Sequence, residues 1–151
     1  MSQTIKCISL WQPWASLMAI GAKKIETRHW PIRYRGPLAI HAAKNESSMH
    51  LLRSAAFNSE LWLHDMVKLD EQFNFISHSL PLGAIVAVVN LTGCERTEDL
   101  VQKISGQEES FGDYSAGRYG WVTQLRYALP EPIPFRGQQG LFDIDAKLVG
   151  L

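Results

Sequence analysis

The segment of residues 9–30 changes its apolar period partway along, and this change constrains the fold more than any other feature of the chain. Pro13 suits the first position of a helix, because its φ is already fixed at a helical value and its missing N–H is not needed there. From residue 24 to residue 28 the period becomes two, as in a strand. A helix over residues 13–20 and a strand over residues 24–28 are therefore predicted. The spacing i, i+3, i+4, i+7 on the helix is met by Trp14, Leu17, Met18 and Gly21.

The turn between these two elements gathers charged side chains. Gly21 suits the left-handed conformation that often ends a helix, and Lys23 follows it in the turn. In the strand, Glu26 and Arg28 share one face, whereas Thr27 points to the other. One interpretation is a surface ion-pair network, worth about 0–1 kcal/mol for each exposed pair. The other is a compact charged site on rigid scaffolding, and the spacing favours neither.

Length and composition predict one globular domain over residues 1–151. The chain has 151 residues, of which 46% are hydrophobic and 20% charged, enough for a sizeable core. It contains no apolar run of the roughly 18 residues that a membrane helix needs, and its first six residues lack the apolar stretch of a signal peptide. A cytoplasmic location without a membrane partner is expected, with Cys7 and Cys94 as thiols rather than a disulfide.

Several kinds of chemistry lack their motifs in this sequence. No Gly-x-Ser-x-Gly, phosphate-binding Gly-x-x-x-x-Gly-Lys or Gly-x-Gly-x-x-Gly pattern is present. The five histidines and two cysteines do not have the spacing of metal ligands, so neither a metal nor a cofactor is predicted. Charge is uneven: residues 1–53 hold eight Lys/Arg against two Asp/Glu, a net +6 within a neutral chain. Such a basic surface, with aromatic residues interleaved, favours contact with phosphates and bases.

The remaining pattern indicates short strands with few helices, which is typical of the α+β class and of a small barrel or bent sheet. Residues 84–91 form an apolar run that suits a central strand buried on both faces. Thr97 is predicted to cap a helix through residue 104, and residues 105–117 are predicted to be a mobile loop. Other strands are expected at residues 5–10, 38–43, 119–127 and 141–144, helical structure at 47–69, and an extended connection at 130–134.

The ordered set of motifs resembles the ASCH domain family, named for activating signal cointegrator homology. Its signature is similar to Gly21-x-Lys23-x-x-Glu26-x-Arg28, and the resemblance covers nearly the whole chain. It implies a PUA-like small β-barrel with a flanking N-terminal helix and a helical insertion, and a cleft lined by the motif residues. The likeness continues through Leu10-Trp11-Gln12-Pro13-Trp14-Ala15, Tyr34-Arg35-Gly36-Pro37-Leu38-Ala39-Ile40-His41, Leu82-Gly83-Ala84-Ile85-Val86, Tyr119-Gly120-Trp121-Val122 and Pro132-Ile133-Pro134-Phe135-Arg136-Gly137.

The favoured hypothesis is a module that binds RNA, a nucleotide or a modified nucleoside in this charged cleft. Glu26 would accept hydrogen bonds from a base amino group or hold Arg28 in place. The phosphate contacts are predicted to come from Arg28, Lys44 and Arg136, and the stacking surfaces from Trp11, Trp30 or Tyr119.

Two alternatives remain open. Some ASCH-like proteins are similar small amidohydrolases that remove acyl groups from modified cytidine, using a lysine, a threonine and a glutamate. Lys23 matches that lysine, but Glu26 stands where the threonine should be, so a hydrolase acting on nucleosides or RNA would use Glu26 to activate water, without an acyl-enzyme. The second alternative is a coactivator-type domain that binds a protein partner.

Overall fold

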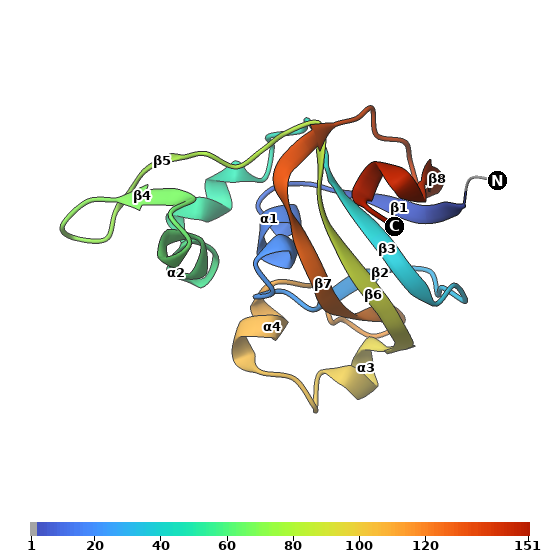
Figure 1. Ribbon diagram of the computed structural model, residues 1–151. Helices are drawn as coiled ribbons and strands as arrows, with labels where there is room; N and C mark the ends of the chain where they lie inside the picture. Colours follow the sequence, from blue (N-terminus) through green and yellow to red (C-terminus); the bar gives the residue numbers. More distant parts are fainter. Residues whose placement is uncertain (1–2) are drawn as a thin grey trace.

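The computed structural model describes residues 3–151 (Figure 1). Residues 1 and 2, which the single-domain prediction includes, lie outside this part. The strands are β1 (Thr4–Leu10), β2 (Ile25–Arg28), β3 (Gly36–Ala42), β4 (Val67–Leu69), β5 (Phe75–His78), β6 (Ala84–Arg96), β7 (Tyr119–Pro134) and β8 (Leu141–Asp145). The helices are α1 (Trp14–Ala19), α2 (Ala55–Leu63), α3 (Thr97–Leu100) and α4 (Gly106–Ser110), with 3-10 turns η1 (Met49–Arg53) and η2 (Ala146–Val149).

Six strands form one mixed sheet in the order β2-β7-β6-β3-β1-β8, while β4 and β5 form a separate two-stranded sheet. Strands β1 and β3 run parallel, and the other neighbours are antiparallel. The predicted α+β class is confirmed. The closed barrel that the resemblance implied is not formed by residues 3–151, because β2 and β8 are the two ends of the strand order and do not pair with each other.

Strand β6 lies in the middle of the sheet, as its apolar run predicted. Its side chains are buried from Ala84 to Val89. Ile85 and Val88 pack in a cluster with residues of β1, β8 and η2. Val89 and Leu91 belong to a second cluster, which contains residues of α1 and Trp121. A continuous apolar run was therefore the right signal, since this strand has no solvent-facing side over that length.

Helix α1 and its turn follow the predicted pattern closely. The helix ends at Ala19, and Gly21 has φ of +79°, the left-handed conformation expected of it. The carbonyl of Leu17 then accepts hydrogen bonds from the backbone N–H groups of Ala22 and Lys23, each at 3.0 Å. These bonds fix the turn that leads into β2, so the charged motif starts from a rigid backbone.

The helical prediction for residues 47–69 is only partly right. Residues 49–53 and 55–63 are helical, and the extended backbone of Ser54 divides them. Asn58 lies buried within α2 and donates to the Leu52 carbonyl. Residues 67–69, which were predicted to be helical, form β4 and pair with β5 in a hairpin. Asp65 adopts a φ of +58°, which ends the helical path.

Two further predictions between residues 97 and 117 are corrected. Helix α3 ends at Leu100, and Thr97 is not its N-cap: its buried hydroxyl donates to the Ser115 and Arg118 carbonyls. The predicted mobile loop contains α4, whose N-cap is Ser105. The extended prediction for residues 130–134 is refined, because this stretch belongs to β7, and Ile133 and Pro134 pair with β6. Prolines are tolerated there because β2 pairs only with residues 119–122 and leaves the outer edge unpaired.

No helix in the described range is both long and apolar enough to cross a membrane.

Candidate functional site

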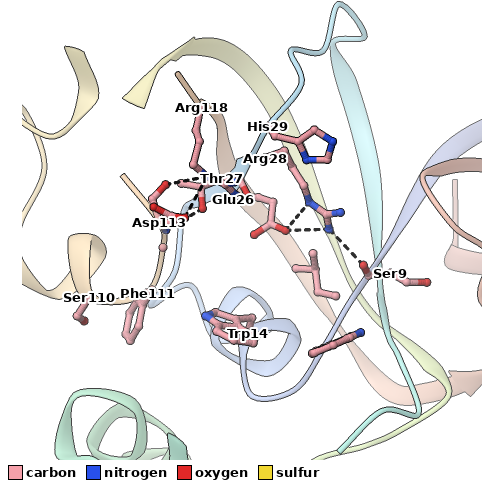
Figure 2. A pocket seen from close by; sticks show the side chains of 13 residues that line it. Ser9, Trp14, Glu26, Thr27, Arg28, His29, Ser110, Phe111, Asp113 and Arg118 are labelled. Atoms are coloured by element: carbon pink, nitrogen blue, oxygen red, sulfur yellow. Dashed lines mark hydrogen bonds and ion pairs between the residues drawn. The ribbon is translucent and has the colours of Figure 1, made fainter. Parts of the chain in front are cut away.

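A pocket of about 600 Å³ opens between the start of α1, strand β2 and the segment that follows α4 (Figure 2). This volume lies in the range typical of small-ligand sites. Its lining consists of Ser9, Leu10, Trp11, Trp14, Glu26, Thr27, Arg28, His29, Ser110, Phe111, Gly112, Asp113 and Arg118. The three sequence-predicted residues among them are Trp11, Glu26 and Arg28.

The motif side chains form a continuous ion-paired chain at the wall of this pocket. The Glu26 carboxylate lies between two cations: Lys23 Nζ is 3.4 Å from Oε1, and Arg28 Nε donates to Oε2 at 2.9 Å. Lys23 is 2% exposed and also donates to the Ile25 carbonyl. Only Arg28 retains appreciable exposure, with 26% of its side chain accessible. The chain of pairs therefore presents a guanidinium to the pocket and an ammonium to the interior.

Strand alternation places these side chains as the sequence predicted. Figure 2 shows Glu26 and Arg28 together, with Thr27 directed toward Asp113 and Arg118. The Thr27 hydroxyl accepts from the Asp113 backbone N–H at 3.0 Å, so it serves the neighbouring segment rather than Glu26. Arg28 is further held by the Ser9 carbonyl, at 3.4 Å from Nη2, and its guanidinium carbon lies 5.9 Å from the centre of the Trp121 ring.

The outer edge of β2 is covered by the segment that contains α4, for which the sequence predicted a loop. The Glu108 side chain is buried, and its carboxylate accepts from the backbone N–H of Lys24 at 2.8 Å and of Ile25 at 3.4 Å. Burial raises the pKa of Glu108, against the lowering effect of these hydrogen bonds and of Lys23. The spacing of Ser105 and Glu108 matches a capping box and would have predicted the helix. No pattern of neighbouring residues in the sequence predicts that the Glu108 carboxylate reaches β2.

A second guanidinium reaches the pocket from this same segment. Arg118 Nε donates to the Asp113 carbonyl at 3.2 Å and lies 3.5 Å from its carboxylate, while Nη2 donates to the Thr27 carbonyl at 3.3 Å. Its side chain is 27% exposed. Arg28 comes from β2 and Arg118 from the segment before β7, and each is oriented by a carboxylate while part of it stays accessible. Trp11, 46% exposed, adds a large apolar surface to the same pocket.

Four of the sequence-predicted binding residues do not line this pocket. Trp30 packs edge-on against Trp121, with ring centres 4.6 Å apart, and its carbonyl accepts from the Trp121 indole N–H. Tyr119 is half-buried on β7, where it pairs with Arg28 in register. Lys44 and Arg136 are exposed elsewhere on the surface. Their predicted roles in binding therefore require a ligand that extends beyond the pocket.

Ser9 connects the pocket to a buried histidine. Its carbonyl faces Arg28, and its hydroxyl lies 2.9 Å from His41 Nδ1. His41 Nε2 lies 2.7 Å from the Phe135 carbonyl, which can only accept, so Nε2 carries a proton and donates there. Gly137 closes over this pair: a Cβ there would lie 2.6 Å from both Ser9 Oγ and His41 Cε1.

We expect Gly137→Ala to break this arrangement, because a methyl group cannot occupy space so close to a buried imidazole. The free energy of unfolding should fall by about 1–3 kcal/mol, the usual cost of overpacking. Denaturant unfolding measures this, with Gly106→Ala as the matched control, since nothing lies within 4 Å of a Cβ at that position. Equal effects of the two substitutions would contradict the close contact.

Over residues 3–151, no group of three or more His, Cys, Asp or Glu side chains is placed to hold a metal ion. Cys7 is buried, and burial raises the pKa of its thiol to about 12.

Comparisons with known proteins agree with the motif. The model of the ASCH domain family matches residues 8–130. Activating signal cointegrator 1 is 24% identical over 143 residues in Homo sapiens and 26% identical over 145 residues in Mus musculus. Each match covers 94% of this chain but 22% of the relative, so the chain spans about a fifth of the length of these relatives.

The fold also has relatives among solved structures. A crystal structure of ASCH from Zymomonas mobilis aligns with a TM-score of 0.56 and 15% identity, over 94% of this chain and 88% of that one. A tyrosine-to-phenylalanine mutant of the same protein aligns with a TM-score of 0.55 and 17% identity, over 97% and 96%. At this identity the likeness concerns the fold alone. Because the family model covers most of the sequence and includes the whole charged motif, the chain belongs to the ASCH domain family.

Proposed function

We propose that this pocket binds a nucleotide unit of single-stranded RNA. The observation that carries the proposal is the pair of partly exposed guanidiniums, Arg28 and Arg118, in one pocket with the exposed indole of Trp11. Guanidiniums recognise phosphate oxygens, and aromatic rings stack on unpaired bases. A pocket of about 600 Å³ has room for one such unit and not for a duplex. Residues 1–151 would form the single domain that carries this site.

Each motif residue has a role in this proposal. Arg28 and Arg118 contact phosphate, and Trp11 stacks on the base. Both oxygens of Glu26 are already ion-paired, so its role is to orient Arg28. Lys23 sits behind Glu26 and keeps that carboxylate in place. Beyond the pocket, Lys44 and Arg136 would contact further phosphates of a longer chain, with Trp30 and Tyr119 as further candidate contacts.

Binding of a short labelled single-stranded RNA, followed by fluorescence anisotropy, tests the proposal. Arg28→Ala and Arg118→Ala should each weaken binding about tenfold or more, because a charge-assisted hydrogen bond contributes about 1.5–3 kcal/mol. Each should also reduce the dependence of affinity on salt by about one unit of slope. Lys68→Ala, an exposed lysine on β4 that does not line the pocket, is the control and should leave binding unchanged. Unaltered binding by both arginine variants would refute the proposal.

Ligands of different length distinguish binding in the pocket from binding to the surface around it. Lys44→Ala with Arg136→Ala should leave the affinity for a nucleoside monophosphate unchanged, because neither side chain lines the pocket. The same double variant should weaken binding of a longer RNA. Titration of both ligands against the wild type and the variant measures this. An effect on the monophosphate would show that the binding site lies elsewhere.

Activity assays of the wild type and of two further variants test the hydrolase alternative. Product formation from N4-acylated cytidine or from RNA, lost in Lys23→Ala and Glu26→Gln, would replace the binding proposal with catalysis through Lys23 and Glu26.

A further inference from the structure

The segment from α2 through β5, residues 54–79, projects from the main sheet as an arm (Figure 1). Of the seven large apolar side chains that are exposed among residues 3–151, this arm carries four. They are Trp62 at 42%, Leu63 at 66%, Phe73 at 68% and Ile76 at 59% exposure. Exposed apolar side chains that are concentrated on one segment, as on this arm, indicate an interaction surface more often than scattered single residues do.

Helix α2 already has a buried side, so these residues are not its missing core. Phe57 and Leu61 face inward and pack with Leu17 of α1 and with Phe111. Trp62 and Leu63 extend the apolar surface to the outer side. A helix that is apolar on both sides is normally covered on both sides. The exposed outer side of α2 is therefore a surface suited to contact with a binding partner.

The hairpin turn holds an aromatic ring against this outer side. Phe73 has a φ of +63°, which is strained for a bulky residue. The turn is fixed by Asp70, whose carboxylate accepts from the backbone N–H groups of Gln72 and Asn74 at 2.9 Å. This conformation places the Phe73 ring edge-on to Trp62, with centres 6.2 Å apart, where most of it remains exposed. The fold thus maintains a strained backbone that displays an aromatic pair.

Charge on the arm determines which occupant fits. Residues 54–79 contain Glu60, Asp65, Asp70 and Glu71 against the single cation Lys68, a net −3. Asp65 and Glu71 are exposed. An anionic membrane surface would be repelled by these carboxylates, whereas Lys and Arg on a protein partner would be attracted.

We propose that the outer face of the arm docks a basic amphipathic helix from another protein. Its apolar face would cover Trp62, Leu63, Phe73 and Ile76, and its flanking cations would meet Asp65 and Glu71. Trp and Phe are side chains that commonly anchor such interfaces. The docking surface is separate from the pocket of Arg28 and does not depend on the function proposed there.

A labelled amphipathic peptide of leucine and lysine tests this on the full chain, with fluorescence anisotropy as the readout. Leu63→Gln should weaken its binding at least tenfold, whereas Leu148→Gln, at an exposed leucine of η2, should not. Asp65→Lys with Glu71→Lys should also weaken binding, and a peptide with glutamate in place of lysine should not bind. Equal binding to all variants, or to a scrambled lysine peptide, would overturn the proposal.

Phe73→Gly distinguishes an effect on peptide binding from an effect on the stability of the fold. Glycine adopts a positive φ without strain, so this variant should unfold at the same or a higher temperature while it loses peptide binding. Retained peptide binding by this variant would overturn the proposal. A dimer in sedimentation that Leu63→Gln dissociates would also overturn it, because the occupant would then be a second copy of the chain.

Discussion

Replacing Lys23 by alanine is expected to lower the free energy of unfolding by about 3–5 kcal/mol, the cost of removing one partner of a buried ion pair. Lys23 is 2% exposed and interacts with Glu26 and with the Ile25 carbonyl. Without it, Glu26 keeps only Arg28, and the interior gains a cavity the size of a lysine side chain. Urea unfolding measures the loss.

Lys24→Ala is the matched control for this prediction, since the neighbouring lysine is exposed and the change should cost less than about 0.5 kcal/mol. A loss below about 1 kcal/mol in Lys23→Ala would show that the ion pair is not a structural element. The charged motif would then owe its geometry to the backbone alone.

Glu108→Ala is the second substitution with a large expected effect. It removes the acceptor from two backbone N–H groups at the edge of β2, and each unsatisfied buried donor costs about 1–3 kcal/mol. A total loss of about 2–4 kcal/mol is expected in denaturant unfolding. Because α4 also precedes the segment with Asp113 and Arg118, RNA binding should weaken together with stability. Glu109→Ala, at the exposed neighbour, should leave both unchanged.

Glu108→Gln tests the protonation of this carboxyl group. Burial raises the pKa of Glu108 above its ordinary value of 4.5, so the folded state binds the proton more tightly than the unfolded state. The resulting stabilisation is complete below pH 4.5 and is lost as the pH rises through the folded-state pKa. The glutamine variant lacks this loss, so its stability relative to the wild type should improve as the pH rises from about 4 to 7. A difference that is constant over this range would contradict the raised pKa.

The part of the site that could be predicted from sequence is the part that depends on local geometry. Gly21 ends the helix, and strand alternation then places Glu26 and Arg28 on one face, because the period of two is a property of the strand itself. The central position of β6 followed equally from its unbroken apolar run. For the same reason, Thr27 could be separated from Glu26 on the sequence alone.

The other half of the site depends on contacts between residues distant in sequence. Glu108 reaches Lys24 and Ile25 across more than 80 residues, and Arg118 reaches Thr27 across 91. No periodicity reports such contacts. The acidic and glycine-rich composition of residues 105–117 instead indicated a loop.

Errors elsewhere in the fold have equally specific causes. Leu63 continues an apparent helical stripe into residues 66 and 67, but it is 66% exposed and the chain turns at Asp65. Periodicity cannot distinguish a buried stripe from an exposed one. Lys44 and Arg136 carry the charge that a phosphate contact needs, but charge does not determine whether a side chain reaches a pocket. Whether the sheet closes into a barrel depends on the order of its strands, and the sequence pattern of short strands does not reveal that order.

The proposed nucleotide of RNA would occupy the pocket between the start of α1, β2 and the segment that follows α4. NMR titration of the isotope-labelled chain with a short single-stranded RNA tests it at the atoms concerned. The Nε–H signals of Arg28 and Arg118 and the indole N–H signal of Trp11 should shift together and saturate with one affinity. Saturating shifts confined to other arginine and indole signals, with these three unchanged, would contradict the claim.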